Sequence, residues 1–485
     1  MPAKEFIVAI ELGSSKITGI AGKKNLDGSI SVLHVVREDP SSCIRKGVIY
    51  NIDKTGACLT NIINKLKTAL KMEIAHVYVG VGGQSIRSEK NNIVKEFSVE
   101  TTITQEMVNE LMDSNRNMVY PEKEILDAAT QEYKVDAQYQ LDPVGIQSMR
   151  LEGNFLNILW RKRFYRMLNQ CFENAGIAIA EMFLAPLALA DSVLTEAEKR
   201  GGCVLIDLGA DTTTVSVFHK NILRHLAVIP LGGNNITKDI ASLQIEEEEA
   251  ERMKLKYASA FTENAEIDST LSYPIDADRS VESRRFIEIV EGRLEEIIEN
   301  AWYQVPSEYI DKLLGGIVLT GGGSNMNNIE KAFRNHTHME KIRIAKFVTH
   351  TVNSSNVEIA AHDGTMNTIL ALLAKGDMNC AGNELDDTRG LFDNNKPTTG
   401  TTTTGIHQTP RTASELPSGV VQTAIEKEKA EEEARRRAEE EAARKAEEEE
   451  NARIAAEEKR KNSPWNKMIR GVKEFGKKIM EADSE

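Results

Sequence analysis

One pattern occurs twice in this chain and restricts its fold more than any other feature. A strand-like apolar run ends in an acidic residue, a glycine two positions later opens a hydroxyl-rich turn, and a second strand-like run follows. The first copy is 6–22 (FIVAIELGSSKITGIAG) and the second is 202–218 (GCVLIDLGADTTTVSVF). Because the copies agree in order and spacing, the sequence predicts one structural unit used in two related halves.

Strands and helices alternate through most of the chain. Two more β-rich runs end in glycine turns, at 76–83 and 316–326, and helical periods occupy 57–70 and 164–175. This alternation is typical of an α/β fold with largely parallel sheets. The 485 residues are enough for about two to four domains.

One apolar stretch, 176–194, needs a separate interpretation. It contains Glu181, Pro186 and Asp191, which leaves nine uncharged residues between the two acids. A membrane span needs about 20 apolar residues, so we interpret the stretch as a buried helix. The start of the chain has no basic-then-apolar secretion signal, and its apolar run is only as long as a strand.

Charge and cysteine content argue against several classes of protein. The formal net charge of −14 argues against a general nucleic-acid binder, which needs a basic surface to meet phosphates. The five cysteines are scattered and form no C-x-x-C pair, which excludes a disulfide scaffold or a zinc ribbon and suits a reducing cytosol. His336 and His338 are too isolated in the sequence to indicate a metal site, and we expect surface histidines.

The first glycine turn has the residues of a phosphate-binding loop. Gly13 allows a tight turn, so that backbone amides and the hydroxyls of Ser14 and Ser15 can point at a phosphate. Glu11, at the strand end, could hold a metal ion through water. Lys16 could supply positive charge to a phosphate, or could simply face solvent.

The second turn repeats this pattern. Asp207 ends a buried apolar strand, where a carboxylate is costly unless it meets a cation or hydrogen-bond donors. Mg²⁺ prefers one or two carboxylates together with waters and phosphate oxygens. We therefore predict that Glu11 and Asp207 hold Mg²⁺, mostly through water. The sequence does not identify a catalytic residue, and Asp207, acting through Mg²⁺ and water, is the best candidate.

A third glycine turn, 320–324 (TGGGS), follows a strand-like run, and its glycines permit close approach of a flat or anionic ligand to the backbone. Each turn alone is also compatible with an ordinary β-hairpin or βα turn. All three together, two with an acid at the strand end, are a much stronger signal. The chain has no G-x-x-x-x-G-K-[ST], so it is not a P-loop NTPase, and 80–83 (GVGG) lacks the dinucleotide fingerprint.

In the order of its turns the chain resembles the actin and sugar-kinase ATPase superfamily, which has two phosphate motifs and a late adenosine motif. Within it, the chain resembles the FtsA family of bacterial cell-division proteins over essentially its whole length, a charged segment near the C-terminus excepted. The motifs that carry this resemblance are 46–49 (KGVI), 231–241 (LGGNNITKDIA), 250–254 (AERMK), 283–293 (SRRFIEIVEGR) and 316–323 (GIVLTGGG). The resemblance implies an α/β, actin-like two-domain ATPase fold of duplicated ribonuclease-H-like halves, with a small inserted α/β domain.

The resemblance also implies which residues bind ATP. Gly13, Ser14, Ser15 and Lys16 would touch the phosphates, with Asp207, Gly209, Asp211 and Thr212 opposite; Gly233 and Asn234 would border the site, Glu251 and Lys254 would reach the ribose, and Gly321, Gly322, Gly323 and Ser324 would hold adenine. On the sequence alone, Glu251 and Lys254 are also compatible with a solvated ion pair on one helix face.

One position departs from the actin-like ATPases that hydrolyse ATP well. Those proteins carry a Gln or Glu on a connecting helix to orient the attacking water, whereas alignment on Pro186 places Ala185 at that step. Glu181 and Asp191 are nearby in the sequence, but neither stands at that position. We therefore predict ATP binding with weak or absent hydrolysis.

The resemblance and the composition together divide the chain into domains. The first actin-like subdomain comprises 1–83 and 163–199, the inserted domain 84–162, the second core subdomain 200–243 and 312–378, and the fourth subdomain 244–311. Composition predicts a disordered linker at 379–425, a charged single-helix spacer at 426–462 and an amphipathic helix at 463–485. In this family the inserted domain helps polymerisation and partner recruitment, and the fourth subdomain binds FtsZ. Arg285 and Arg293 are candidates for that contact, although a charge run is more often a solvated helix face.

The charged segment predicts a solvated helix. From 426 to 461, 25 of 36 residues are charged and nine are alanine, and Glu precedes Arg or Lys by four residues at several places. Ile454 is its only large apolar residue, so it has no coiled-coil seam. We interpret it as a spacer about 54 Å long, at 1.5 Å per residue.

The last 23 residues have a different pattern. Ser463 and Pro464 are typical of a helix start, and apolar residues then form one stripe opposite basic ones. The stripe is Trp465, Met468, Ile469, Val472, Phe475 and Ile479, and the basic residues include Lys467, Arg470 and Lys473. A helix docked on the protein's own core is the alternative, but the long segment before it favours a membrane-interface helix attracted to anionic lipid. The FtsA family ends in the same way.

These observations predict an actin-like ATP-binding cell-division protein of the division septum. We expect it to polymerise on the inner face of the cytoplasmic membrane, to tether FtsZ filaments there, and to help recruit later division proteins into the divisome. The alternative is a small-molecule kinase or polyphosphatase-like enzyme on the same fold, which needs a catalytic carboxylate facing its substrate. The sequence shows no such residue, and a membrane helix would have no purpose in that enzyme.

Overall fold

The computed structural model describes residues 5–384 except 42, 269 and 277, residues 418–424, and part of the charged segment (426–429, 431, 432, 435, 436 and 444). Described residues up to Thr423 belong to one compact unit, and those from Ala424 onward belong to a second. The described residues of the second unit are helical. The predicted membrane helix, 463–485, lies outside the described residues. Among the described residues, no helix is long and apolar enough to cross a membrane.

The first large sheet has seven strands. In spatial order they are β20 (Val352–Asn353), β3 (Ile30–Glu38), β2 (Ile17–Lys24), β1 (Ile7–Leu12), β7 (His76–Val81), β12 (Ala178–Leu184) and β22 (Val420–Val421). Strands β1, β2 and β3 form an antiparallel meander, whereas β7 and β12 run parallel to β1. Strand β22 closes one edge, antiparallel to β12.

The second large sheet has nine strands. In spatial order they are β10 (Gln138–Gln140), β9 (Lys123–Val135), β11 (Gln147–Arg161), β8 (Arg87–Thr102), β15 (Ile222–Ile229), β14 (Thr213–His219), β13 (Cys203–Leu208), β18 (Gly316–Thr320) and β19 (Ile342–Ile344). Two-stranded pairs complete the strands: β4 (Ile44–Arg45) with β5 (Val48–Ile49), β6 (Met72–Ile74) with β21 (Ala381–Glu384), and β16 (Ser272–Pro274) with β17 (Ser280–Glu282).

The strand order confirms the predicted duplication. In one half it is β3-β2-β1-β7-β12 and in the other β15-β14-β13-β18-β19, each an antiparallel meander followed by two parallel strands. The prediction of largely parallel sheets is wrong in this detail. The first two glycine turns, 13–16 and 209–212, each join two neighbouring strands with four residues, and only antiparallel strands can be joined so directly.

Helices of the described residues are α1 (Ile52–Leu70), α2 (Gln105–Arg116), α3 (Lys162–Asn174), α4 (Ala185–Val193), α5 (Glu196–Gly201), α6 (Gly233–Ala241), α7 (Glu247–Tyr257), α8 (Ser283–Tyr303), α9 (Ser307–Ile310), α10 (Ile329–Thr337), α11 (Val357–Ala360) and α12 (Asn367–Lys375). Two of them, α1 and α12, cover opposite faces of the first sheet. On strand β2, the Cα of Gly19 faces Ile62 of α1 and that of Gly22 faces Leu373 of α12. Helix α12 therefore packs on the first sheet, although the sequence places it in the second core subdomain.

The apolar stretch 176–194 is not one buried helix, and that prediction is wrong. Strand β12 pairs with β7 up to Leu184, and α4 begins at Ala185 with Pro186 in its first turn. Proline favours a helix start because its missing N–H is not needed there. A continuous apolar run has no period, so the sequence alone does not separate strand from helix.

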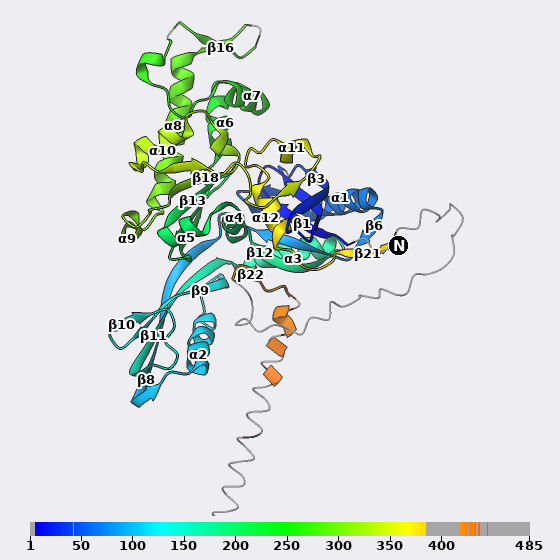
Figure 1. Cartoon of the computed structure of the whole chain (residues 1–485). Helices are drawn as coiled ribbons and strands as arrows, with labels where there is room; N and C mark the ends of the chain where they lie inside the picture. Colours follow the sequence, from blue (N-terminus) through cyan, green and yellow to red (C-terminus); the bar gives the residue numbers. More distant parts are fainter. Residues whose placement is uncertain are drawn as a thin grey trace, which may run out of the picture. The chain divides into compact units, whose positions relative to one another are not determined.

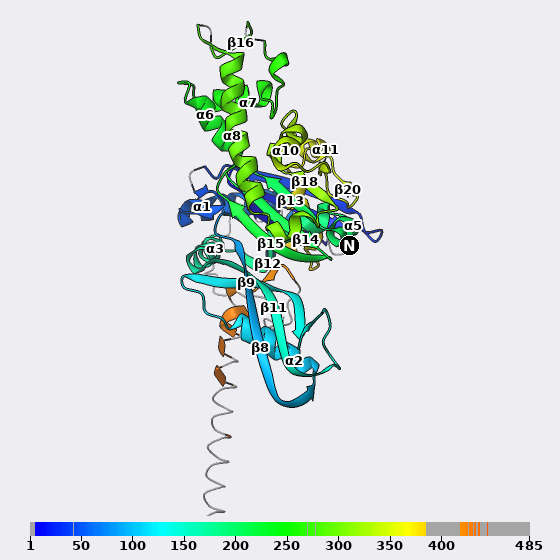
Figure 2. The same ribbon diagram turned by 90° about the vertical axis from the view of Figure 1, so that its left-hand side faces the viewer.

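The inserted domain is confirmed as a small α/β unit. Its long strands β8, β9 and β11 are antiparallel, and α2 packs on them around Leu111, Tyr133 and Phe155. The cap of α2 is Thr104, whose hydroxyl accepts a hydrogen bond from the Met107 amide. Figures 1 and 2 both show β8 and α2 at one end of the first unit and the β16 hairpin, beside α8, at the other.

The predicted linker, 379–425, differs from the structure at both ends. Residues 381–384 form β21, which pairs with β6, and residues 420–421 form β22. Residues 385–417, between these strands, lie outside the described residues.

Candidate nucleotide site

The two hairpin turns have the same backbone geometry. A Cβ atom added to Gly13 would lie 2.7 Å from the Lys16 carbonyl oxygen, and one added to Gly209 would lie 2.7 Å from the Thr212 carbonyl oxygen. In the second turn the Gly209 amide donates to that same Thr212 oxygen at 3.0 Å. Both positions therefore have no room for a side chain, which explains why each turn contains glycine.

Acidic residues end the strands that lead into both turns. Glu11 lies opposite Thr18 in the β1–β2 hairpin, and Asp207 lies opposite Thr214 in the β13–β14 hairpin. The pKa of Glu11 is raised to about 7: burial is the main cause and the nearby Asp207 adds to it, while Lys16 and Arg37 act in the opposite direction. Burial likewise raises the pKa of Asp207 to about 6, against the effect of Lys16. Charges from both halves therefore act on one another at the ends of equivalent strands.

Two features of this acidic pair fit a divalent cation. Within the described part of the chain, Oε2 of Glu11 is buried without a hydrogen-bond partner. Lys16, the cation that acts on both carboxyls, has its own pKa lowered by burial. Carboxylates of this kind are the preferred ligands of Mg²⁺, together with water and phosphate oxygens.

The first turn is held by contacts with distant segments. Lys16 Nζ donates to the Thr365 carbonyl at 3.1 Å, so Lys16 does not simply face solvent. Ser14 Oγ accepts from the Gly47 amide at 2.7 Å, whereas Ser15 is exposed.

The second turn is held through Asp211. Its Oδ1 accepts from Asn234 Nδ2 at 2.8 Å, and its Oδ2 accepts from the Lys46 amide at 3.2 Å. The Lys46 contact joins the two halves, since Lys46 belongs to the first and Asp211 to the second. Thr212, beside it, is partly buried.

Helix α6 starts against the second turn. The Gly233 amide donates to the Gly209 carbonyl at 3.0 Å, and the Asn234 amide donates to the Ala210 carbonyl at 2.7 Å. These two amides are therefore already satisfied, and Gly233 and Asn234 border the turn by bracing it.

Glu251 and Lys254 form more than a solvated ion pair. Lys254 Nζ lies 2.7 Å from Glu251 Oε2 and donates to the Gly233 carbonyl at 3.1 Å and to Thr237 Oγ1 at 2.9 Å. The Lys254 side chain is only 10% exposed and that of Glu251 39%. This pair joins α7 to α6 beside the second turn.

The third turn packs on the second. Gly321 has φ +81°, and a Cβ atom there would lie 2.3 Å from Asp207 Oδ1. One at Gly323 would lie 2.9 Å from the Leu208 Cβ. The Ser324 hydroxyl is buried and donates to the Gly321 carbonyl at 2.7 Å, and Gly322 is exposed. The structure thus brings together turns that are more than 100 residues apart in sequence.

Sequence reasoning missed three residues at this site. Thr365 binds Lys16 across 349 residues of sequence, Thr237 binds Lys254, and Lys46 binds Asp211. Two of these contacts use backbone groups, which leave no signal in residue type. Thr237 lies in the motif 231–241, four residues after Gly233 and on the same face of α6. This four-residue spacing could have identified Thr237 as a site residue.

Comparison with known proteins decides the family. A model described as "Cell division protein FtsA" matches residues 204–363, and a model of the "SHS2 domain inserted in FTSA" matches residues 83–159. The FtsA of Porphyromonas gingivalis is 32% identical over 332 residues, which are 67% of this chain and 69% of that protein. The chain belongs to the FtsA family of cell division proteins. The FtsA of Bacillus subtilis is also 32% identical, over 68% of this chain and 76% of that protein.

A solved structure confirms the predicted fold class. A chain of a PilM–PilN type IV pilus biogenesis complex aligns with a TM-score of 0.52, covering 77% of this chain and 98% of that one. At 14% identity this likeness shows the fold alone. Together with the duplicated strand order and the SHS2 insert, it places this FtsA-family chain in the actin-like fold.

Three residues named for the water-orienting position, Ala185, Asp191 and Glu181, lie in β12 and α4 of this FtsA-family chain. Ala185 is the first residue of α4. Asp191, farther along, accepts from Lys199 at 2.8 Å and from Lys375 at 2.6 Å. Glu181 is a buried residue of β12.

The two arginines named for partner contact differ in the structure. Arg285 is exposed on α8. Arg293 instead contacts Asp239 of α6 through two nitrogens, at 2.5 and 3.1 Å, and also pairs with Glu296. Arg293 therefore holds α8 to α6 in this FtsA-family protein.

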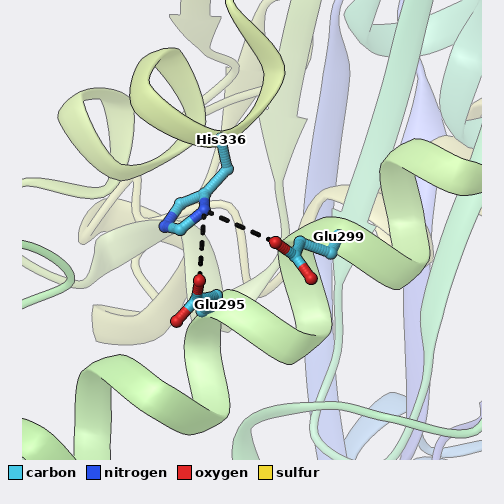
Figure 3. Close-up of side chains that lie close together, drawn as sticks. All are labelled: Glu295, Glu299 and His336. Atoms are coloured by element: carbon cyan, nitrogen blue, oxygen red, sulfur yellow. Dashed lines mark ion pairs between the residues drawn. The ribbon is translucent and has the colours of Figure 1, made fainter.

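His336 is less isolated than its sequence suggests. Its Nδ1 lies 3.9 Å from Glu295 Oε1 and 4.0 Å from Glu299 Oε1, both on α8 (Figure 3). The two glutamates are exposed, His336 is partly buried, and His338 is exposed. The histidine on α10 thus forms ion pairs with α8 when it is protonated.

Proposed function

We propose that this FtsA-family protein binds ATP with Mg²⁺ where the two glycine turns meet. The observation that carries the proposal is the set formed by Glu11, Asp207 and Lys16 at the ends of equivalent strands from the two halves. The cation Lys16 suits phosphate oxygens. The carboxylates suit the metal ion that accompanies them.

Glu11 and Asp207 would hold Mg²⁺, mostly through water. The bound ion supplies positive charge that neutralises phosphate oxygens. Gly13 and Gly209 keep both turns free of side chains, so that the phosphates approach the backbone of Ser14 and Thr212. Lys254 and Glu251 would reach the ribose, and the backbone of Gly321–Ser324 would border adenine.

Hydrolysis in this protein is proposed to be weak. A catalytic glutamine or glutamate orients water only if its side chain is free to face the phosphate. Ala185 has no such group, and Asp191 is already bound by two lysines. ATP then acts by fixing the conformation that assembles rather than by turnover.

The C-terminal segment is proposed to hold the protein to the inner face of the cytoplasmic membrane. The apolar stripe with Trp465 and Phe475, opposite Lys467, Arg470 and Lys473, supports this proposal. Such a helix lies in the interface and is attracted to anionic lipid. It lies outside the described residues, so the proposal rests on sequence.

At the membrane the protein is proposed to polymerise and to tether FtsZ filaments at the division site. Membership in the FtsA family supports both steps, and the fourth subdomain, with the exposed Arg285, would face FtsZ. The inserted domain would contact neighbouring copies and later division proteins.

Co-sedimentation of the full chain with anionic liposomes tests the proposed function. We expect the wild type to pellet, the variant Trp465→Glu with Phe475→Glu to stay soluble, and ATP with Mg²⁺ to change the amount assembled on lipid. FtsZ filaments should pellet with the wild type only. Equal pelleting of variant and wild type would contradict the membrane proposal, and rapid phosphate transfer to a sugar or polyphosphate would favour the enzyme alternative.

A further inference from the structure

The chain returns to the first unit after the long segment 385–417. Val420 and Val421 form strand β22, which pairs with Phe183 and Met182 of β12. The Leu184 amide also donates to the Gly419 carbonyl at 2.8 Å. A short stretch near the end of the predicted linker (379–425) therefore extends the first sheet by one edge strand.

The same stretch donates hydrogen bonds to a buried carboxylate of the inserted domain. Asp127, only 3% exposed, accepts from the Gly419 amide at 2.7 Å and from the Ser418 hydroxyl at 3.4 Å through Oδ2. The Arg116 guanidinium lies 3.9 Å from its other oxygen. Burying a carboxylate is costly without donors, so residues 418 and 419 supply part of what Asp127 needs.

Apolar packing adds to these polar contacts. Val420 is 7% exposed and Val421 is 1% exposed. The Tyr165 hydroxyl of α3 donates to the Gln422 carbonyl at 3.3 Å. Gly419 has φ +86°, a conformation that favours glycine, and it lies beside Leu187 of α4. Residues 418–423 thus contact β12, α3, α4 and the inserted domain.

We propose that residues 418–423, here called the strap, dock on the surface formed by the edge of β12 and Asp127. We further propose that this docking sets the length of the tether, the chain that connects the first unit to the membrane helix. The tether part of this inference rests on the proposed membrane function. With the strap docked, 39 residues (424–462) separate the first unit from 463–485; with it released, 78 residues (385–462) do. The additional 39 residues span at most about 140 Å when fully extended.

Docking can be tested in solution, without lipid. In the full chain, Val420→Asp with Val421→Asp should release the strap, since two buried apolar side chains become charged. The Leu184 amide should then exchange hydrogen at least tenfold faster. The matched control is Val119→Asp with Val357→Asp, whose valines are 83% and 81% exposed, and it should leave that exchange unchanged.

A labelled peptide of residues 416–424 gives a second measurement. It should bind the strap-release variant saturably, and at least tenfold more weakly to the wild type, where the surface is already filled. Binding to neither protein, or equally to both, would overturn the inference, as would unchanged exchange at Leu184 in the variant.

The tether is measured separately, by neutron reflectometry on a supported anionic bilayer. Release of the strap should move the protein layer farther from the bilayer than in the wild type and the control. An unchanged height in a variant that binds the peptide would overturn the tether part. Absence of any protein layer would contradict the proposed membrane function, and the solution measurements would still decide the docking.

Discussion

The turns Gly13–Lys16 and Gly209–Thr212 share a backbone but differ in their side chains. In both, a glycine lies against the carbonyl three residues later, at the same 2.7 Å from an added Cβ. The first turn carries Lys16, which acts on the carboxylates of both halves. The second carries Asp211, whose two oxygens are bound by Asn234 and by the Lys46 amide.

The difference shows how a duplicated scaffold can divide its tasks. In the proposed function, the repeated backbone would provide two equivalent positions for phosphate groups. The first turn contributes the cation, and the second contributes an anion that braces its own turn and joins it to the first half. This comparison predicts which substitutions should be equivalent and which should not.

The largest effects are expected when a methyl side chain replaces the hydrogen of the glycine in either turn. Gly13→Ala and Gly209→Ala should each weaken ATP binding more than 100-fold and lower the free energy of unfolding by about 2 kcal/mol, because the Cβ would overlap a carbonyl oxygen. Calorimetric titration with ATP and urea unfolding measure the two effects. The control Gly292→Ala, in the interior of α8 with open space around it, should leave ATP binding unchanged and should raise, not lower, the free energy of unfolding, by up to about 1 kcal/mol. If the losses in the free energy of unfolding for Gly13→Ala and Gly209→Ala differ by more than about 1 kcal/mol, the two turns are not equivalent.

The next largest effect, on ATP affinity, should distinguish the first turn from the second. Lys16→Met should weaken ATP binding about 30-fold or more, since a charge-assisted contact to phosphate contributes about 2–3 kcal/mol. Asp211→Asn should weaken binding less than about 5-fold, because its contacts lie within the protein and the amide oxygen can still accept one of the two hydrogen bonds. Equal losses in the two variants would mean that the division of tasks is wrong.

A pH effect should distinguish the two acidic residues. The raised pKa values, about 7 for Glu11 and about 6 for Asp207, mean that the folded protein binds more protons than the unfolded chain above about pH 4. Without Mg²⁺, these groups should therefore reduce stability as pH rises from about 4 to 7. Glu11→Gln should flatten the upper part of this dependence, and Asp207→Asn the part below pH 6. Thermal unfolding in metal-free buffer measures it, and an unchanged pH profile in both variants would contradict the buried acidic pair.

The smallest effect is expected at the ribose end. Glu251→Gln should weaken ATP binding about 3-fold, because the Glu251 side chain is 39% exposed and water screens its contacts. The matched control Glu249→Gln, on the same helix, should leave ATP affinity unchanged. A loss in the control as large as that at Glu251 would place the effect in helix stability rather than in ribose contact.

Much of this fold could be predicted from the sequence, since the acid, glycine and hydroxyl pattern that repeats at Glu11 and Asp207 marks both hairpins. Long-range contacts could not be predicted in the same way. Lys16 meets the carbonyl of Thr365, and Asp211 meets the amide of Lys46; backbone groups are present at every residue and give no local pattern.

Two other differences have related causes. The stretch 176–194 is apolar on every side, so its division into β12 and α4 follows from pairing with β7 rather than from a local period. The strap is short and follows a polar segment. Its strand forms because the edge of β12 and the carboxylate of Asp127 are available to it.

The central claim is that both turns bind one nucleotide together, and a double-mutant cycle in ATP binding tests it most directly. Calorimetry with Mg²⁺ would compare the full-length wild type, Lys16→Met, Asp207→Asn and the double variant. Because both residues would act on the same phosphate and metal ion, we predict a coupling of at least about 1 kcal/mol between them. Strictly additive losses, or wild-type affinity in all three variants, would contradict a shared site.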